Sequence, residues 1–296
     1  MRSRQNNSAT RDADPTNGNN SATTSTQVVA VADLSVNSAS VQSPPTQLII
    51  GQTLNVTNRA VVANLGPSSP IDANVTATST ASPGSSVTPA SVTSPVTALA
   101  VGTPRNVDSV FTIGCSAPGS HTYTFTDRIA PKNAIDTDPN STNNSKTVTL
   151  TIDCVVPIAI NIQPGSNPNS VYLANDTIPL AALTTRAGEY GLPLAFDATK
   201  IKPLTVKFGP RASVFAGTGG TTEVHSQGHI ENAFERTTTA RETVKDGDLD
   251  MLLHFSGPLS GLKKTDIEAC IKGDYVDQAT GNTYRFFGCD AIRPVP

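Results

Sequence analysis

The sequence predicts an all-β protein of two β-sandwich domains in tandem, the first immunoglobulin-like, preceded by a disordered or single-strand N-terminal stub. Short stretches in which apolar and polar residues alternate recur along the 296 residues, with turn residues between them. Such alternation is typical of half-buried strands. Val and Thr, which favour strands, are abundant, and the 22 prolines are too widely scattered for long helices. At about 100–150 residues per domain, the chain has room for two.

A phrase that occurs twice sets the domain organisation. DADPTNGNNS at residues 12–21 returns as DTDPNSTNNS at residues 136–145, an offset of 124 (136 minus 12). A fixed offset indicates a tandem repeat. We therefore expect the stub of a preceding repeat at residues 1–30, one complete repeat at 31–155 and a different module at 156–296. On this interpretation the chain is the C-terminal slice of a longer protein.

The strands of the first domain are predicted from series of apolar residues that share one face. In each series, polar residues separate the apolar ones. About seven short strands with turns between them predict an immunoglobulin-like sandwich. The series are Leu54, Val56, Ala60 and Val62; residues 71–80; Phe111, Ile113 and Cys115; Tyr123 and Phe125; and Val148, Leu150, Ile152 and Cys154.

This repeat also resembles a known family. The motifs are ADLSV at 32–36, the stretch 56–67 that ends in NLGP, and the closing residues 138–145. Together they resemble the repeats of bacterial and archaeal cell-surface proteins, which include the cell-adhesion-related domain of bacteria and its relatives. The resemblance covers about residues 32–154 and implies an immunoglobulin-like spacer or adhesive module. The cysteine pair departs from it, since many such repeats have none.

Residues 156–296 do not continue the repeat and are predicted to form a second, independent β-sandwich. Alternation at 158–162 leads into a turn cluster, and further strands are expected at 170–173, 178–184, 204–208, 251–255, 266–272 and 283–287. The polar, Gly- and Thr-rich stretch 217–245 indicates a long loop. Two strands flank the turn sequence at 277–282, which predicts a hairpin.

The four cysteines fall as one pair in each predicted sandwich, and neither pair has the CxxC spacing of zinc or redox sites. Cys115 and Cys154 each end an inward-facing series, so a bridge between them could join the sandwich. In a hairpin that pairs the two tyrosines flanking its turn, Cys270 falls opposite Cys289. We expect two disulfides and hence an oxidising compartment. The alternative is four reduced thiols in a cytosolic chain.

The second module has a resemblance of its own. IQPGSNPNS at 162–170, FDA at 196–198, VKFG at 206–209, GHIE at 228–231, DLD at 248–250, EAC at 268–270 and GC at 288–289 resemble a C-terminal module of secreted bacterial proteins. The module has no functional name. It recurs behind unrelated domains, which implies an accessory role.

Glu231, Asp246, Asp248 and Asp250, which we call the acidic set, are the best candidates for a metal site. Carboxylates at alternate positions around a glycine can direct several oxygens to Ca²⁺. In the module that this region resembles, the run from GHIE to the aspartates is short and acidic, whereas residues 232–241 intervene here. The alternative is a solvated acidic turn. The same two interpretations, calcium or Asx turns, apply to Asp136, Asp138, Asn140, Asn143 and Asn144.

The histidines are not expected to form a metal site. His225 and His229 are four residues apart, a spacing that suits zinc on a helix, but glycines at 219, 220 and 228 make a helix improbable. His254 lies in an apolar strand and is expected to be a histidine at the edge of the core.

Composition and missing motifs exclude several classes of function. A net charge of −3 with 15% charged residues offers no basic patch for nucleic acid. There is no apolar run of about 18 residues to cross a membrane, and no apolar core follows Arg2 and Arg4 as in a signal peptide. We find no GxSxG motif, no free thiol paired with histidine and no phosphate-binding loop, so we expect no enzyme.

The sequence therefore favours a non-catalytic extracellular or cell-surface protein with a structural or adhesive role. Its expected partners are cell-surface or matrix components, protein or polysaccharide, and its expected export signal lies upstream of this chain. No cofactor is predicted apart from the calcium candidate. The alternative is an accessory, polysaccharide-binding region of a secreted hydrolase.

Overall fold

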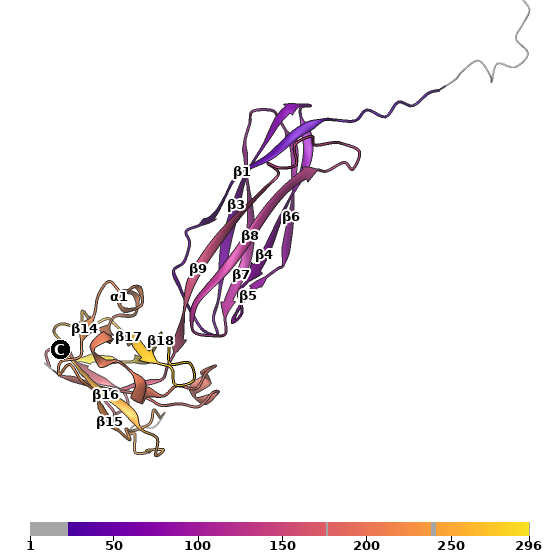
Figure 1. The fold of residues 1–296 in the computed structure, drawn as a ribbon. Helices are drawn as coiled ribbons and strands as arrows, with labels where there is room; N and C mark the ends of the chain where they lie inside the picture. Colours follow the sequence, from indigo (N-terminus) through magenta and orange to yellow (C-terminus); the bar gives the residue numbers. More distant parts are fainter. Residues whose placement is uncertain (1–22, 176, 238–240, 296) are drawn as a thin grey trace, which may run out of the picture.

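The computed structural model describes residues 23–175, 177–237 and 241–295. The first copy of the repeated phrase and most of the expected stub lie outside these residues. Residues 23–29 are exposed, Ala30 is half-buried, and this segment leaves one end of the N-terminal sandwich without joining a sheet (Figure 1). The all-β prediction is confirmed, because strands make up both halves of the described chain.

The N-terminal half is a sandwich of two antiparallel sheets. One sheet has the order β1-β3-β7-β5, and the facing sheet runs β6-β4-β8-β9, with the short β2 parallel to β9. Long strands replace several of the short ones expected, since β3 has 15 residues and β8 and β9 have 13 each. The strands are β1 (Ala32–Gln42), β2 (Gln47–Ile49), β3 (Thr53–Pro67), β4 (Ile71–Ala81), β5 (Ser85–Thr88), β6 (Ser91–Leu99), β7 (Arg105–Cys115), β8 (Gly119–Pro131) and β9 (Ser145–Pro157).

The core of this sandwich is close to the predicted one. Phe111 of β7 and Phe125 of β8 are fully buried, with ring centroids 5.0 Å apart. Leu54, expected inside, is 39% exposed because it lies at the open end of β3, beside a surface cleft. The inward-facing series of β3 also contains a polar residue, Asn58. Asn58 is fully buried, and its amide donates to both carboxylate oxygens of the buried Asp127, at 2.8 and 2.9 Å.

The C-terminal half packs a small sheet, β10-β12-β16-β15, against the sheet β14-β13-β17-β18. Phe208 of β13 stacks on Phe255 of β16 at 5.0 Å in the core between them. The strands are β10 (Ile160–Ile162), β11 (Ser170–Tyr172), β12 (Ile178–Ala182), β13 (Lys207–Gly209), β14 (Thr221–Thr222), β15 (His229–Glu231), β16 (Asp250–Phe255), β17 (Glu268–Val276), β18 (Thr283–Ala291) and β19 (Arg293–Val295), which pairs with β11.

Most strands predicted for this half are present, with boundaries shifted by a few residues. The strand expected at 204–208 is wrong over its first half: Pro203–Thr205 forms a 3-10 turn, and β13 begins only at Lys207. Proline has no N–H to donate to a neighbouring strand, which suits it to the start of such a turn. The predicted loop 217–245 contains two short strands, β14 and β15. Helix α1 (Arg211–Ala216) was not predicted, nor were the 3-10 turns Glu189–Gly191 and Ala198–Lys200.

The terminal hairpin has the register that the sequence predicts. In the antiparallel pair β17–β18, Tyr275 lies opposite Tyr284 and Cys270 opposite Cys289. A disulfide joins Cys270 to Cys289, with the Cα atoms 4.0 Å apart.

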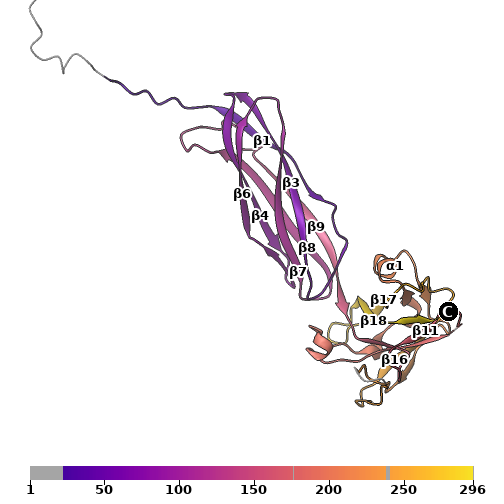
Figure 2. The same cartoon turned by 180° about the vertical axis from the view of Figure 1, so that it is seen from behind.

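Strand β9 belongs to both halves of the molecule. Its first part pairs with β8 in the N-terminal sandwich, and its end, Val156 and Pro157, pairs in parallel with Phe286 and Phe287 of β18. Figures 1 and 2 show β9 passing from the sandwich into the C-terminal half. The two sandwiches are therefore joined by main-chain pairing, and not only by a linker as an independent second sandwich would be.

Among the described residues, no helix is long and apolar enough to cross a membrane.

Candidate functional site

The structure does not gather the acidic set into one cluster. Asp250 is fully buried, and its two oxygens accept hydrogen bonds from the backbone N–H groups of Thr184 (2.8 Å) and Ala233 (2.9 Å). Glu231 is exposed on β15, and Asp246 accepts from the N–H of Asp248. Within the described part of the chain, no three of these four carboxylates come close enough to form a metal-sized group. Calcium binding by this set stays a prediction.

The acidic residues of the repeated phrase hold the start of β1. Asp136 accepts from the N–H of Ala30, and Asp138 accepts from the N–H of Leu34, both at 3.0 Å. The second oxygen of Asp138 accepts from the N–H of Asn140 at 2.9 Å. Asn143 donates its amide to Asp33 at 2.8 Å, and its backbone carbonyl accepts from Val36. Of these bonds, only the one from Asn140 to Asp138 is the local contact of an Asx turn, and the others fasten β1 to this loop. Calcium binding by these residues stays a prediction.

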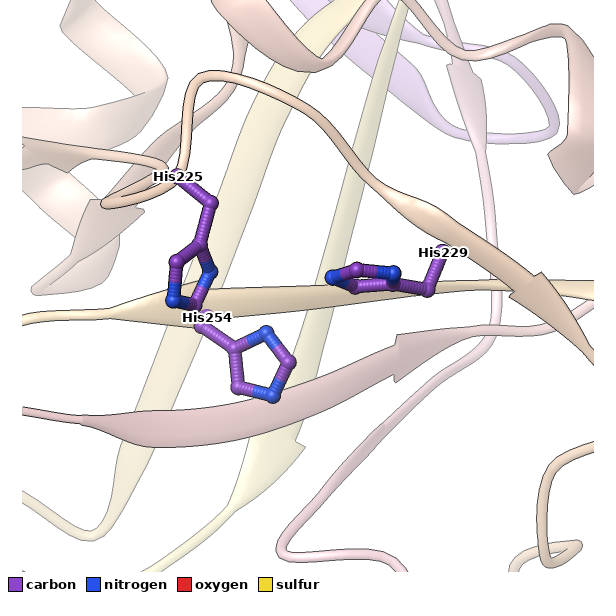
Figure 3. Close-up of side chains that lie close together, drawn as sticks. All are labelled: His225, His229 and His254. Carbon is purple, nitrogen blue, oxygen red and sulfur yellow. The ribbon is translucent and has the colours of Figure 1, made fainter.

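Three histidines that the sequence did not assign to a site lie together in the C-terminal half. His225, His229 and His254, which we call the histidine cluster, each offer a ring nitrogen within 4.8 Å of the others. Their ring centroids are 5.0 to 6.1 Å apart, and the rings turn toward a common space (Figure 3). His225 and His229 are exposed and His254 is half-buried.

A buried carboxylate forms hydrogen bonds with two residues of this cluster. The Glu223 side chain is fully buried, and its Oε1 lies 3.2 Å from Nδ1 of His225. The same oxygen accepts from the N–H of His254, and Oε2 accepts from the N–H of Gln227. Glu223 therefore fixes the ring of His225 and the backbone on both sides of the cluster. Sequence reasoning missed Glu223, because nothing in the local pattern marks it as buried.

Burial sets the ionisation of the neighbouring groups. It lowers the pKa of His254, and the adjacent His225 lowers that pKa further. In the loop that follows β15, burial raises the pKa of Glu235 to about 7, although the hydroxyl of Tyr190 donates to its Oε2 at 2.6 Å.

The other candidate sites are a disulfide and a cleft. Cys115 of β7 is joined to Cys154 of β9, the pairing that the sequence predicts, and this bond links the two sheets of the N-terminal sandwich. A mainly apolar cleft of about 480 Å³ lies where β2 and the start of β3 meet α1. Its only charged lining residue is Arg211, so it presents no acid–base or nucleophilic pair.

No protein-family model matches this sequence, and no curated protein matches it. Solved structures with a detectable likeness include the CARDB domain of the PF1109 protein from Pyrococcus furiosus, in complex with di-metal ions: 15% identity, 44% of this chain, 99% of that chain, TM-score 0.29. They also include a 1.5-MDa bacterial ice-binding adhesin (13% identity, 90% and 66%, TM-score 0.22) and domains 5–6 of the S-layer protein SbsC (14%, 89% and 100%, TM-score 0.20). At these scores the likenesses carry no argument about function.

Proposed function

We propose that this chain is a non-catalytic structural and adhesive part of an extracellular or cell-surface protein, in which the repeat at residues 31–155 is a spacer that presents the module at 156–296. The observation that carries the proposal is the continuity of β9 from one sandwich into the sheet of the other. A spacer has to hold what it presents at a fixed distance and orientation. A strand shared by two sheets does so without a flexible linker.

Side-chain contacts around β9 support a stiff junction. Val155 and Val156 are buried, and Arg285 of β18 forms an ion pair with Asp153 at 3.1 Å. The ammonium group of Lys272 on β17 donates to the side chain of Gln47 on β2, which pairs with β9. The junction thus combines main-chain pairing, apolar burial and polar contacts, each of which opposes bending.

The disulfides support the extracellular location. The four cysteines form two disulfide bonds, and among the described residues no cysteine is free. Disulfides persist in oxidising compartments and are rare in reducing ones.

Small-angle X-ray scattering of the purified chain tests the spacer. We expect the chain to scatter as one extended, rigid particle that fits the structure. Its expected binding partners are cell-surface or matrix components. A Gly-Ser insertion between Val155 and Val156 separates the part of β9 that lies in the N-terminal sandwich from the part that pairs with β18. This variant should scatter as two bodies with free relative motion. If the unaltered chain already scatters like the insertion variant, the spacer proposal fails. The genomic sequence upstream separates this proposal from the alternative: further repeats of about 124 residues favour the spacer, and a hydrolase domain favours an accessory region of a secreted hydrolase.

A further inference from the structure

In the histidine cluster three potential metal ligands converge, and one of them has a buried nitrogen without a hydrogen-bond partner. Three of the four histidines of the chain meet at one place, although their segments are read as loop and strand edge in the sequence. Nδ1 of His254 is buried and has no hydrogen-bond partner. A buried, unpartnered nitrogen costs free energy unless another ligand satisfies it.

The backbone brings the cluster together along one edge of β16. The segment at 223–224 pairs with the end of β16, where the N–H of Val224 donates to the carbonyl of His254 at 2.9 Å. The chain then loops out and returns as β15, which pairs with the start of β16, His229 lying opposite Leu252. Because residues two apart in a strand share a face, His254 and His229 are diagonal neighbours on one face of the sheet.

Two residues of the loop let it turn this tightly. Ser226 has a left-handed backbone conformation (φ 58°). Gly228 lies so close to Met251 and Leu253 that a Cβ atom there would collide with their side chains. The chain therefore returns close to β16, and this places the ring of His225 beside that of His254.

We propose that His225, His229 and His254 bind one divalent transition-metal ion of the zinc class on the outer face of β15 and β16. Three imidazoles suit zinc, whereas calcium and magnesium prefer oxygen ligands. Nitrogens bound to zinc at about 2.0–2.1 Å in a tetrahedron lie about 3.3 Å apart. The exposed rings of His225 and His229 can close the present spacing by rotating about their side-chain bonds.

Glu223 completes this site as a positioning residue. A histidine that binds metal through one ring nitrogen commonly has its other nitrogen hydrogen-bonded to a carboxylate, which fixes the ring and its tautomer. The bond from His225 Nδ1 to Glu223 leaves Nε2 of His225 for the metal. The bound ion ties the 223–231 segment to β16. The site is independent of the spacer proposal, because it lies away from β9.

Isothermal titration of the tag-free chain with ZnCl₂, with CaCl₂ as a comparison, tests this proposal. We expect one zinc ion per chain, and at least about tenfold weaker binding in His225→Ala and in His229→Ala. Both side chains are exposed, so these variants should fold, as circular dichroism without metal will show. Glu223→Gln should weaken zinc binding by about 10- to 100-fold, the range measured for such supporting carboxylates.

His121 on β8 supplies the matched control. Its Nε2 lies 3.0 Å from the carbonyl oxygen of Ala117, far along the chain from the cluster. His121→Ala should leave zinc affinity unchanged, and in proton NMR the His121 ring signals should stay in place while the other three histidines shift on zinc addition. Equal zinc affinity in the unaltered chain and in the His225→Ala/His229→Ala double variant would overturn the proposal, as would a shift of the His121 signals alone.

Discussion

Replacing Asp138 by alanine should release the start of β1 from the N-terminal sandwich. One oxygen of this carboxylate accepts from the N–H of Leu34, whose side chain is fully buried, and the other accepts from the N–H of Asn140. No other residue of the phrase can take over both donors, since Asp136 is engaged with Ala30. Asp138→Ala therefore leaves two main-chain donors without their partner.

The expected cost follows from where these two donors lie. A buried donor that loses its acceptor costs about 1–3 kcal/mol, whereas a donor near the surface regains a partner from water. The N–H of Leu34 is of the first kind and the N–H of Asn140 of the second. We expect Asp138→Ala to lower the free energy of unfolding by about 2–3 kcal/mol. Asp138→Asn keeps one acceptor oxygen and should cost about half as much.

Urea unfolding followed by circular dichroism measures this cost, and hydrogen exchange of peptides from β1 locates it. The matched control is Asp108→Ala on the same sandwich, which removes an exposed ion pair with Arg59. Exposed ion pairs contribute little, so this variant should unfold nearly as the unaltered chain does. The reasoning is refuted if the two variants are equally stable, or if exchange in β1 is the same in both.

Three further predictions concern the disulfides, pH and calcium. Cys115 and Cys154 are 39 residues apart, so replacing both by serine should lower the free energy of unfolding in urea by about 4 kcal/mol. For the hairpin pair Cys270 and Cys289, 19 residues apart, the expected loss is about 3 kcal/mol. Equal stability of the chain with and without reductant would contradict both values. Burial raises the pKa of Glu235 from 4.5 to about 7, so the folded chain keeps a proton that the unfolded chain loses between these values. Stability should therefore fall as pH rises from 4.5 to 7, and Glu235→Gln should flatten that part of the profile relative to the unaltered chain. If the acidic set binds calcium, the melting temperature should be higher in millimolar CaCl₂ than in chelator. An unchanged melting temperature would show that the calcium prediction is wrong.

The parts of the fold that the sequence predicts are those with a strong local signal. Alternation places Phe111 and Phe125 in the core, and turn chemistry together with cysteine spacing gives the register of the β17–β18 hairpin. The parallel pairing of Val156 with Phe286 joins residues 130 apart in the chain, and no local pattern records it. The buried Asn58 interrupts an apolar series, and only its contact with Asp127 explains why a polar residue is tolerated there.

Among the candidate sites, too, only those with a local sequence signal can be predicted. Cysteine pairs can be predicted because two like residues must meet. The histidine cluster depends on the pairing of β15 with β16, and β15 has three exposed residues with no alternation, so the sequence predicts a loop there. The spacing of His225 and His229 suits zinc only on a helix, and the glycines around them argue against a helix. A strand register, rather than a helix, is what brings them to His254.

The position of the repeated phrase bears on how the spacer would carry load. The chain joins the N-terminal sandwich at the start of β1 and leaves it at the far end of β9, so tension between these points acts along the strands (Figure 1). Asp136 and Asp138 fix the start of β1 to the loop that leads directly into β9. At the other end of β9, the bond between Cys115 and Cys154 ties it to the opposite sheet. Under the proposed function, each end of the load path is therefore held to the rest of the sandwich, by carboxylate hydrogen bonds at one end and by a disulfide at the other. Pulling the two ends apart along the strands requires many main-chain hydrogen bonds between paired strands to break together instead of one at a time.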